Sequence, residues 1–220
     1  RILWGRGYLL EELGGLRLAV SPRAFFQVNT RQAEVLLQVV AAYAGLGEGG
    51  VTVLDAYCGT GLLGLYLARH GARVVGIEEV PEAVEDARAN AERNGLAGRA
   101  SFRLGRVEEV LPRLVREGVR FQAAVLDPPR SGCEPAVLEA LAAAAVARVV
   151  YVSCHPETLA RDLARLVALG YRVERVQPVD LFPHTAHVEV VAGLRRAGDE
   201  RAGGGPGEAV VVSGPPAPPR

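Results

Sequence analysis

The sequence predicts an α/β fold built on a mostly parallel sheet with an antiparallel edge. From residue 51 onward, short runs of β-branched and aliphatic residues alternate with longer stretches of helical periodicity. Such alternation is typical of βαβ units, whose strands run parallel. The last two strand-like runs follow each other without a helix, which predicts an antiparallel edge. A chain of 220 residues suits one or two domains with a real hydrophobic core.

The first elements are a hairpin and a helix. Residues 8–20 are predicted to form two short strands, with Gly14 and Gly15 as the turn between them. A helix over residues 30–43 should follow, with Thr30 as its N-cap candidate. Its apolar residues recur at helical spacing and should share one buried face. These residues are Ala33, Leu36, Leu37, Val40 and Ala41.

The remaining elements alternate between strand and helix. The first strand runs into a glycine-rich turn, Gly59-Thr60-Gly61, where the backbone can turn tightly and approach a ligand closely. The Gly-, Pro- and Arg-rich residues 195–220 predict a disordered tail. The predicted strands are 51–55, 72–77, 100–104, 123–127, 149–153, 171–179 and 186–194. The predicted helices are 62–70, 81–94, 107–117, 135–145 and 158–169.

Composition argues against several classes of protein. The chain carries 25 basic and 25 acidic residues, so it has no global positive field, and only local basic patches would mark a nucleic-acid partner. Cys58, Cys133 and Cys154 have neither disulfide nor metal-ligand spacing, which favours a reducing, cytoplasmic location and argues against a structural metal. No stretch reads as a membrane span. The chain begins with Arg1 and contains no methionine, which suggests a fragment of a longer protein.

Two strand ends carry chemically reactive side chains. Cys154 follows the run 149–153, and the proline two residues later ends that strand. Asp127 ends another run and opens an Asp-Pro-Pro turn, which is rigid because proline fixes φ. Ligands of open α/β sheets bind outside the carboxyl ends of the strands, so a nucleophile and an acid there indicate an active site. The alternative is that Cys154 is a small buried hydrophobe.

The glycine turn is compatible with two cofactors. Gly59-Thr60-Gly61-Leu62-Leu63-Gly64 fits the dinucleotide fingerprint, and Glu78, about 20 residues on, can accept ribose hydroxyls. Asp55 at the strand end would repel a pyrophosphate, whereas it suits the cationic ammonium and sulfonium of S-adenosylmethionine. We therefore favour S-adenosylmethionine, with a nicotinamide cofactor or a purely structural βα turn as alternatives. Arg130 stands where amino-group methyltransferases often stack an aromatic ring on a base, which disfavours amine methylation.

Together these motifs resemble the RNA uracil-5 methyltransferase family, which makes 5-methyluridine in transfer and ribosomal RNA. The matching segments occur in the family's order and cover about residues 7 to 194. The last three are specific, whereas the glycine loop alone is not. The segments are Phe25-Phe26-Gln27-Val28-Asn29, Leu54-Asp55-Ala56-Tyr57-Cys58-Gly59-Thr60-Gly61, Gly76-Ile77-Glu78, Asp127-Pro128-Pro129-Arg130-Ser131-Gly132, Val152-Ser153-Cys154-His155-Pro156-Glu157-Thr158-Leu159-Ala160-Arg161-Asp162 and Asp180-Leu181-Phe182-Pro183-His184-Thr185-Ala186-His187-Val188-Glu189.

The resemblance implies a Rossmann-like, S-adenosylmethionine-dependent methyltransferase fold and methylation of carbon 5 of a uridine in RNA. By the same resemblance, Cys154 is the nucleophile that adds to carbon 6, and Glu189 is the base that removes the carbon 5 proton. Strand alternation alone would leave Glu189 facing solvent. The family's cofactor contacts carry over to Gln27, Tyr57, Glu78 and Asp127.

The resemblance also implies how the chain is divided. Residues 1–30 should be the end of a central or linker subdomain, and residues 31–194 the catalytic domain. The RNA-binding β-barrel that family members usually carry, and the four-cysteine iron–sulfur site of some members, are not found in this sequence. His155 and Leu62 stand where the family usually has asparagine, and Tyr57 replaces a frequent phenylalanine.

Two other functions compete with this one. An RNA cytosine-5 methyltransferase would also use a cysteine and would recruit Cys133, although Arg130 stands where that chemistry usually places its cysteine. A non-catalytic S-adenosylmethionine-binding module would need neither Cys154 nor Glu189. The sequence does not specify which RNA or which uridine is modified.

Overall fold

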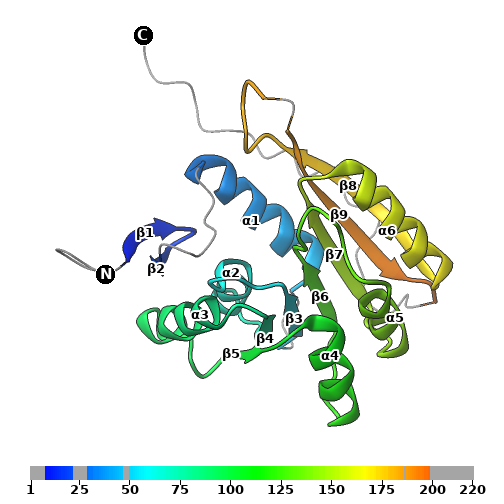
Figure 1. The fold of residues 1–220 in the computed structure, drawn as a ribbon, viewed down its shortest axis with the longest axis horizontal. Coiled ribbons are helices and arrows are strands. Elements are labelled where there is room, and N and C mark those ends of the chain that lie inside the picture. Colours follow the sequence, from blue (N-terminus) through cyan, green and yellow to red (C-terminus); the bar gives the residue numbers. More distant parts are fainter. Residues whose placement is uncertain (1–7, 22–28, 47–49, 186, 199–220) are drawn as a thin grey trace.

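The computed structural model describes residues 8–21, 29–46, 50–185 and 187–198. Its centre is a seven-stranded sheet of order β5-β4-β3-β6-β7-β9-β8 (Figure 1). Strand pairs from β5 through β7 are parallel, and β9 is antiparallel to β7 and to β8. The α/β fold with an antiparallel edge is therefore confirmed. The strands are β3 (Thr52–Ala56), β4 (Arg73–Glu78), β5 (Ala100–Leu104), β6 (Ala123–Leu126), β7 (Arg148–Ser153), β8 (Tyr171–Val179) and β9 (Glu189–Arg196).

Six helices cover the two faces of this sheet in the described part of the chain. Helices α1 to α3 share one buried core with the sheet, and α4 to α6 share the other. Among the described residues, no helix combines the length and apolarity needed to cross a membrane. The helices are α1 (Thr30–Ala44), α2 (Leu62–Arg69), α3 (Pro81–Arg93), α4 (Val107–Arg116), α5 (Pro135–Ala143) and α6 (Pro156–Ala168).

Side-chain alternation along each strand explains the two cores. In β3, Val53 packs into the core of α1 to α3, while Leu54 packs into the core of α4 to α6. Both side chains are fully buried. A parallel strand covered on both faces reads as a continuous apolar run, which is why these strands were visible in the sequence.

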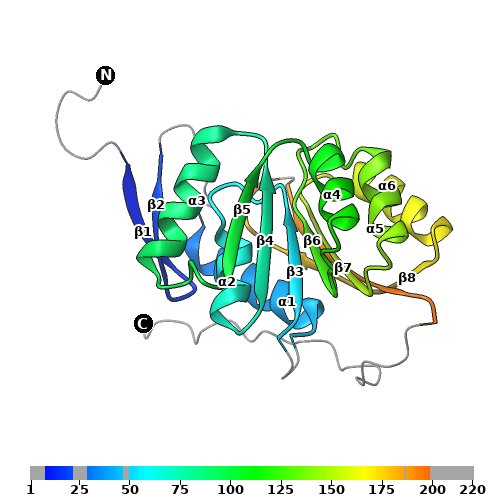
Figure 2. The same ribbon diagram turned by 90° about the horizontal axis from the view of Figure 1, so that it is seen from below.

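The hairpin is a separate two-stranded sheet formed by β1 (Leu9–Leu13) and β2 (Leu16–Val20). It lies beside α3 (Figure 2), and Leu13 on its inner side belongs to the core of α1 to α3. The buried Asn90 of α3 pairs with the backbone of Ala19, accepting from its N–H at 2.7 Å and donating to its carbonyl at 3.0 Å. The hairpin with its Gly14-Gly15 turn is confirmed, and the division of the chain at residue 30 stays a prediction.

Several element boundaries differ from the sequence prediction by one to three residues. Asn29, not Thr30, is the N-cap of α1, and its side chain accepts a hydrogen bond from the Gln32 N–H at 3.3 Å. Helix α6 begins at Pro156 instead of residue 158, because proline is well suited to the first turn. Strand β9 spans Glu189–Arg196, so it starts and ends later than predicted. Residues 199–220 of the expected tail lie outside the described residues.

Candidate active site

The sheet order brings five strand ends to one edge of the molecule. Tyr57, Glu78, Asp127 and Cys154 stand at or just beyond the carboxyl ends of β3, β4, β6 and β7. Because β9 runs in the opposite direction, its first residue, Glu189, reaches the same edge. Four of these strands are parallel, so their carboxyl ends form the crevice in which open α/β sheets bind ligands.

The turn after β3 is shaped by backbone strain and by a buried acid. Tyr57 has a φ of +64°, and Gly61, the N-cap of α2, has a φ of +86°. Any side chain at Gly61 would lie 3.0 Å from the Phe102 ring. Asp55 is fully buried, and its Oδ2 accepts the Gly64 N–H of α2 at 2.8 Å. Asp55 therefore fixes the start of α2 from beneath, instead of facing a ligand as the sequence suggested.

The environment of Asp55 disfavours its charge. Its Oδ1 has no hydrogen-bond partner. Burial, followed by the negative charges of Asp127 and Glu78, raises the pKa of Asp55 to about 7, against the partial relief of the Gly64 hydrogen bond.

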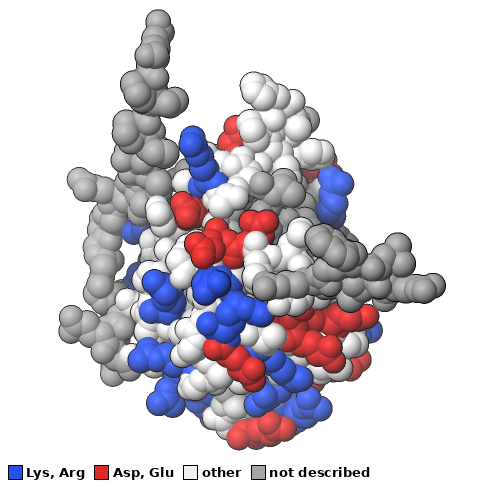
Figure 3. Space-filling view, turned by 90° about the vertical axis from the view of Figure 1, so that its left-hand side faces the viewer, with Lys and Arg blue, Asp and Glu red and all other residues white. Residues whose placement is uncertain are grey.

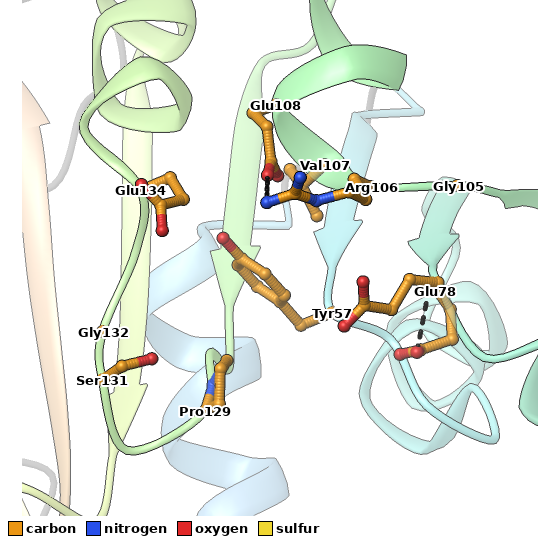
Figure 4. A pocket seen from close by; sticks show the side chains of 11 residues that line it. Tyr57, Glu78, Gly105, Arg106, Val107, Glu108, Pro129, Ser131, Gly132 and Glu134 are labelled. Carbon is orange, nitrogen blue, oxygen red and sulfur yellow. Dashed lines mark hydrogen bonds and ion pairs between the residues drawn. The ribbon is translucent and has the colours of Figure 1, made fainter.

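Glu78 is oriented by backbone donors. Its Oε2 accepts the Gly59 N–H at 3.0 Å, and its Oε1 accepts the N–H groups of Glu79 and Val80, both at 2.9 Å. The carboxylate is thereby held at the mouth of a pocket into which the Tyr57 ring projects (Figure 4). The pocket is lined by residues from the ends of β3, β4 and β5 and from the loop after β6: Tyr57, Glu78, Glu79, Gly105, Arg106, Val107, Glu108, Pro129, Ser131, Gly132 and Glu134.

Cys154 and Glu189 lie side by side across the β7–β9 pair. Ser153 pairs with Val190 in the antiparallel register, which places the following Cys154 opposite Glu189. Glu189 is 4% exposed, whereas Cys154 is half-buried. Burial, together with the nearby Asp127, raises the pKa of Glu189 to about 8.

The charges around Cys154 oppose one another. Burial and the Glu189 carboxylate raise the pKa of the Cys154 thiol, with a smaller contribution from Asp127. The Arg130 guanidinium counteracts them and lowers it. Asp127 itself is half-buried, and burial raises its pKa to about 7. The edge thus combines a thiol, two acids of raised pKa and one cation.

Comparisons with known proteins agree with this geometry. Residues 16–197 match the model of a protein family described as tRNA (uracil-5-)-methyltransferase. The chain belongs to this family. An uncharacterized RNA methyltransferase of Oceanobacillus iheyensis is 47% identical over 194 residues, which are 88% of this chain and 42% of that protein. An uncharacterized RNA methyltransferase of Clostridium tetani is 44% identical over 200 residues, which are 91% of this chain and 43% of that protein. The chain thus spans about two fifths of the length of these relatives.

Solved structures place the fold in the same class. The tRNA (uracil-54, C5)-methyltransferase of Pyrococcus abyssi, solved with S-adenosyl-L-homocysteine, is 36% identical with a TM-score of 0.75, and the match covers 87% of this chain and 45% of that one. An S-adenosylmethionine-dependent methyltransferase of Agrobacterium tumefaciens shares the fold at 14% identity, with a TM-score of 0.68 over 87% of this chain and 71% of that one. The Rossmann-like methyltransferase fold expected from the sequence is confirmed.

The structure gathers most of the residues that the sequence singled out for this family. Tyr57, Glu78, Asp127, Cys154 and Glu189 all lie at one edge of the sheet. Gln27 lies outside the described residues. Within the described ranges, no group of histidine, cysteine or acidic side chains has the arrangement of a metal site.

Sequence reasoning missed part of the pocket wall. Gly105, Arg106 and Glu108 follow β5 and line the pocket, where Arg106 and Glu108 form an ion pair (Figure 4). The sequence did contain a signal for these residues, because a predicted strand ends at residue 104. The carboxyl end of a parallel strand lies at the same edge of the sheet as the crevice. No side chain of obvious chemistry marked that end.

Proposed function

We propose that this chain is the methyl-transferring part of an S-adenosylmethionine-dependent RNA uracil-5 methyltransferase. The observation that carries the proposal is the pairing of a half-buried Cys154 with a buried Glu189, at the edge of the sheet that also carries the pocket lined by Tyr57 and Glu78. A nucleophile and a base at adjacent positions suit the two half-reactions of this chemistry.

The pocket has the groups that S-adenosylmethionine needs. The Glu78 carboxylate suits the two ribose hydroxyls, and the Tyr57 ring offers a flat apolar surface to the cofactor. Asp127, at the end of β6 and not among the residues that line the pocket, offers negative charge, when ionised, for the cationic ammonium and sulfonium. Gln27 is a fourth proposed contact, by family resemblance. When bound, the cofactor supplies the methyl group; the same ligand class occupies the Pyrococcus abyssi relative as S-adenosyl-L-homocysteine.

Carbon 5 of uracil is a weak nucleophile and must be activated. The Cys154 thiolate attacks carbon 6 and forms a carbon–sulfur bond, which moves the electron pair of the carbon 5–carbon 6 double bond to carbon 5. Carbon 5 would then take the methyl group that bound S-adenosylmethionine supplies, and the methyl–sulfur bond would break to leave S-adenosyl-L-homocysteine. Glu189 removes the remaining proton from carbon 5, the double bond re-forms, and Cys154 leaves as a thiolate. The protein is regenerated once Glu189 releases its proton.

The charges of Glu189 and Arg130 have opposite effects on the pKa of the Cys154 thiol. A carboxylate whose pKa is raised to about 8 holds an abstracted proton more firmly than an ordinary glutamate, so it is a stronger base when ionised. Its negative charge opposes formation of the Cys154 thiolate. The positive charge of Arg130 offsets part of this opposition. The pKa of the Cys154 thiol is still raised overall, so Arg130 limits the rise and does not cancel it.

The proposed substrate is a uridine in transfer or ribosomal RNA. A paired uridine must leave its stack to reach Cys154, and single-stranded or looped RNA makes this easier. On the face formed by the hairpin and α3, acidic and basic side chains are interspersed (Figure 3), with Arg88 and Arg93 exposed beside Glu85 and Glu92. The described residues of this face therefore offer no single-sign patch for a phosphate backbone.

Cytosine-5 methylation is disfavoured by the surroundings of Cys133. This thiol is 4% exposed, and burial raises its pKa to about 12. A thiol that is both buried and protonated is a poor nucleophile. Cys154 is the more accessible of the two.

A suicide substrate tests the proposal. The chain is incubated with S-adenosylmethionine and a short RNA that contains 5-fluorouridine, and covalent adducts are located by mass spectrometry. Fluorine does not leave as a cation, so the methylated adduct should persist on Cys154. Cys154→Ala should abolish the adduct, and the matched control Cys133→Ala should retain it. An adduct on Cys133, or one formed only with 5-fluorocytidine, would overturn the uracil assignment. Tight S-adenosyl-L-homocysteine binding with no adduct on any RNA would favour a non-catalytic module.

A further inference from the structure

The loop after β6 is fastened to helix α6 at successive backbone positions. The Thr158 hydroxyl donates to the Arg130 carbonyl at 3.1 Å. The Arg161 guanidinium donates to the Ser131 carbonyl at 2.9 Å. Thr158 and Arg161 are three residues apart on α6, so they present these groups from one face of the helix.

Asp162, on the same helical face, makes the buried part of this attachment. It is 2% exposed, and its Oδ2 accepts the Cys133 N–H at 2.8 Å and the Tyr151 hydroxyl at 2.6 Å. Its Oδ1 accepts the Arg161 Nε–H at 2.8 Å. A Cβ at Gly132, which has a φ of +81°, would lie 2.5 Å from Asp162 Oδ2, so the loop approaches the carboxylate as closely as glycine permits.

Stability alone is a weak reason for such an arrangement. A buried charge costs desolvation energy, and a well-packed apolar replacement is often as stable. What such a carboxylate provides is a defined geometry, because both of its oxygens accept hydrogen bonds and three donors fix its orientation. Here the donors come from the loop, from β7 and from α6.

These elements are the ones that flank the nucleophile. Cys154 lies between Tyr151 of β7 and the first turn of α6. The loop carries Arg130, the cation that offsets the carboxylates around the thiol. We propose that Asp162 is a positioning residue that locks the segment following Asp127-Pro128-Pro129-Arg130 to β7 and α6 and thereby sets the position of Arg130 relative to the Cys154 thiol.

The test measures the reactivity of Cys154 and needs neither RNA nor cofactor. The rate of carboxamidomethylation of Cys154 by iodoacetamide is followed from pH 6 to 10 by mass spectrometry, with the buried Cys58 and Cys133 resolved as separate peptides. Tyr151→Phe removes one donor to Asp162 and keeps the ring in the core. We expect the alkylation profile to move to higher pH by about half a unit, which is about threefold in rate below the midpoint.

Tyr171→Phe is the matched control. Its hydroxyl is also buried, and it donates to the carbonyls of Leu141 and Val146, remote from the loop. A general loss of core packing would shift the alkylation profiles of both variants alike, whereas a positioning role of Asp162 would shift only the profile of Tyr151→Phe. Asp162→Asn should produce a larger shift of the same sign, and Tyr151→Phe carries the test if that variant does not fold.

A double variant identifies the group through which Asp162 acts. Arg130→Gln alone should move the profile upward, and adding Tyr151→Phe should then change little, because the cation to be positioned is gone. A Tyr151→Phe profile that overlays the unmodified protein, or an undiminished shift in the Arg130→Gln background, would overturn the inference. The inference rests on the proposed function only in taking Cys154 as the nucleophile. If no 5-fluorouridine adduct forms but the pH profiles of alkylation shift as described, the proposed methyltransferase function is overturned and the positioning role of Asp162 is retained.

Discussion

Replacing Asp55 by asparagine should stabilise the protein at alkaline pH. Asp55 is fully buried, its Oδ1 has no partner, and its pKa is raised from 3.8 to about 7 by burial and by Asp127 and Glu78. Between these two values the folded state holds a proton that the unfolded state has released. The free energy of unfolding therefore falls as pH rises through this interval, and the full penalty is present above about pH 7.

The magnitude follows from the shift. A rise from 3.8 to about 7 corresponds to about 4 kcal/mol lost once the buried carboxylate is ionised. The amide introduced by Asp55→Asn would keep an acceptor for the Gly64 N–H but would place an unpartnered nitrogen where Oδ1 lies, at a cost of about 1–3 kcal/mol. We expect a net gain of about 1–3 kcal/mol at pH 8.

The pH dependence is the sharper measurement, because the cost of the amide is the same at every pH. Urea unfolding followed by circular dichroism at pH 5 and pH 8 should show the difference between Asp55→Asn and the parent protein growing by about 2–3 kcal/mol toward pH 8. Glu85→Gln, which removes an exposed carboxylate of α3, controls for the loss of one negative charge. A constant deficit for Asp55→Asn at both pH values would refute the reasoning and show that the ionised carboxylate stabilises the start of α2.

Three further outcomes test the proposed chemistry. The Glu189→Gln variant should still form the bond between Cys154 and the RNA and should still allow methylation of carbon 5, but its turnover should fall by about 100-fold or more. A covalent RNA–protein complex should therefore accumulate on denaturing gels, and normal turnover would exclude Glu189 as the base. Methylation by the unmodified protein should increase between about pH 7 and 9, because Glu189 has a pKa of about 8 and the pKa of Cys154 is raised, so both must lose protons; a flat steady-state profile would contradict this. Glu78→Gln should weaken S-adenosyl-L-homocysteine binding by about 10-fold in calorimetry, since hydrogen bonds to a charged group contribute about 1.5–3 kcal/mol, and unchanged affinity would remove Glu78 from the ribose site.

The elements were predictable from sequence because both periodicity and strand ends are local signals. Buried strands such as β6 and β7 are continuous apolar runs, and Asp127 and Cys154 follow them directly. The order of strands in the sheet is not a local property, so the contact between the start of β9 and the end of β7 required the structure or a family resemblance. Without knowledge of that pairing, the alternation of side chains along the strand predicts that the Glu189 side chain faces solvent.

The surroundings of buried polar residues were harder to predict from the sequence. Asp162 reads in the sequence as an ordinary helix carboxylate that follows Arg161, yet it is buried and bonded to Tyr151 and to the backbone of Cys133. Asp55 was correctly placed at a strand end, but its side chain turns under α2 and serves the Gly64 N–H. In both residues the direction of the side chain depends on a partner about ten or more positions away, and hydrophobic patterning does not carry that information.

The reversal of β9 explains how one edge of the sheet holds both the proposed nucleophile, Cys154, and the proposed base, Glu189. In a purely parallel sheet, catalytic side chains all follow strands and sit on turns. Cys154 is such a residue, placed on the turn between β7 and α6, where the Ser153 hydroxyl oxygen accepts the His155 N–H at 3.0 Å. Glu189 instead begins a strand that is paired on both sides, with β7 and with β8, where its own partner is Val179. Its backbone is therefore held by the ladder with β8, and the ladder with β7 begins at the next residue, Val190. In the proposed reaction, the antiparallel strand thus holds the proton acceptor, Glu189, at the same edge where the Cys154 thiol must bond to carbon 6 and detach.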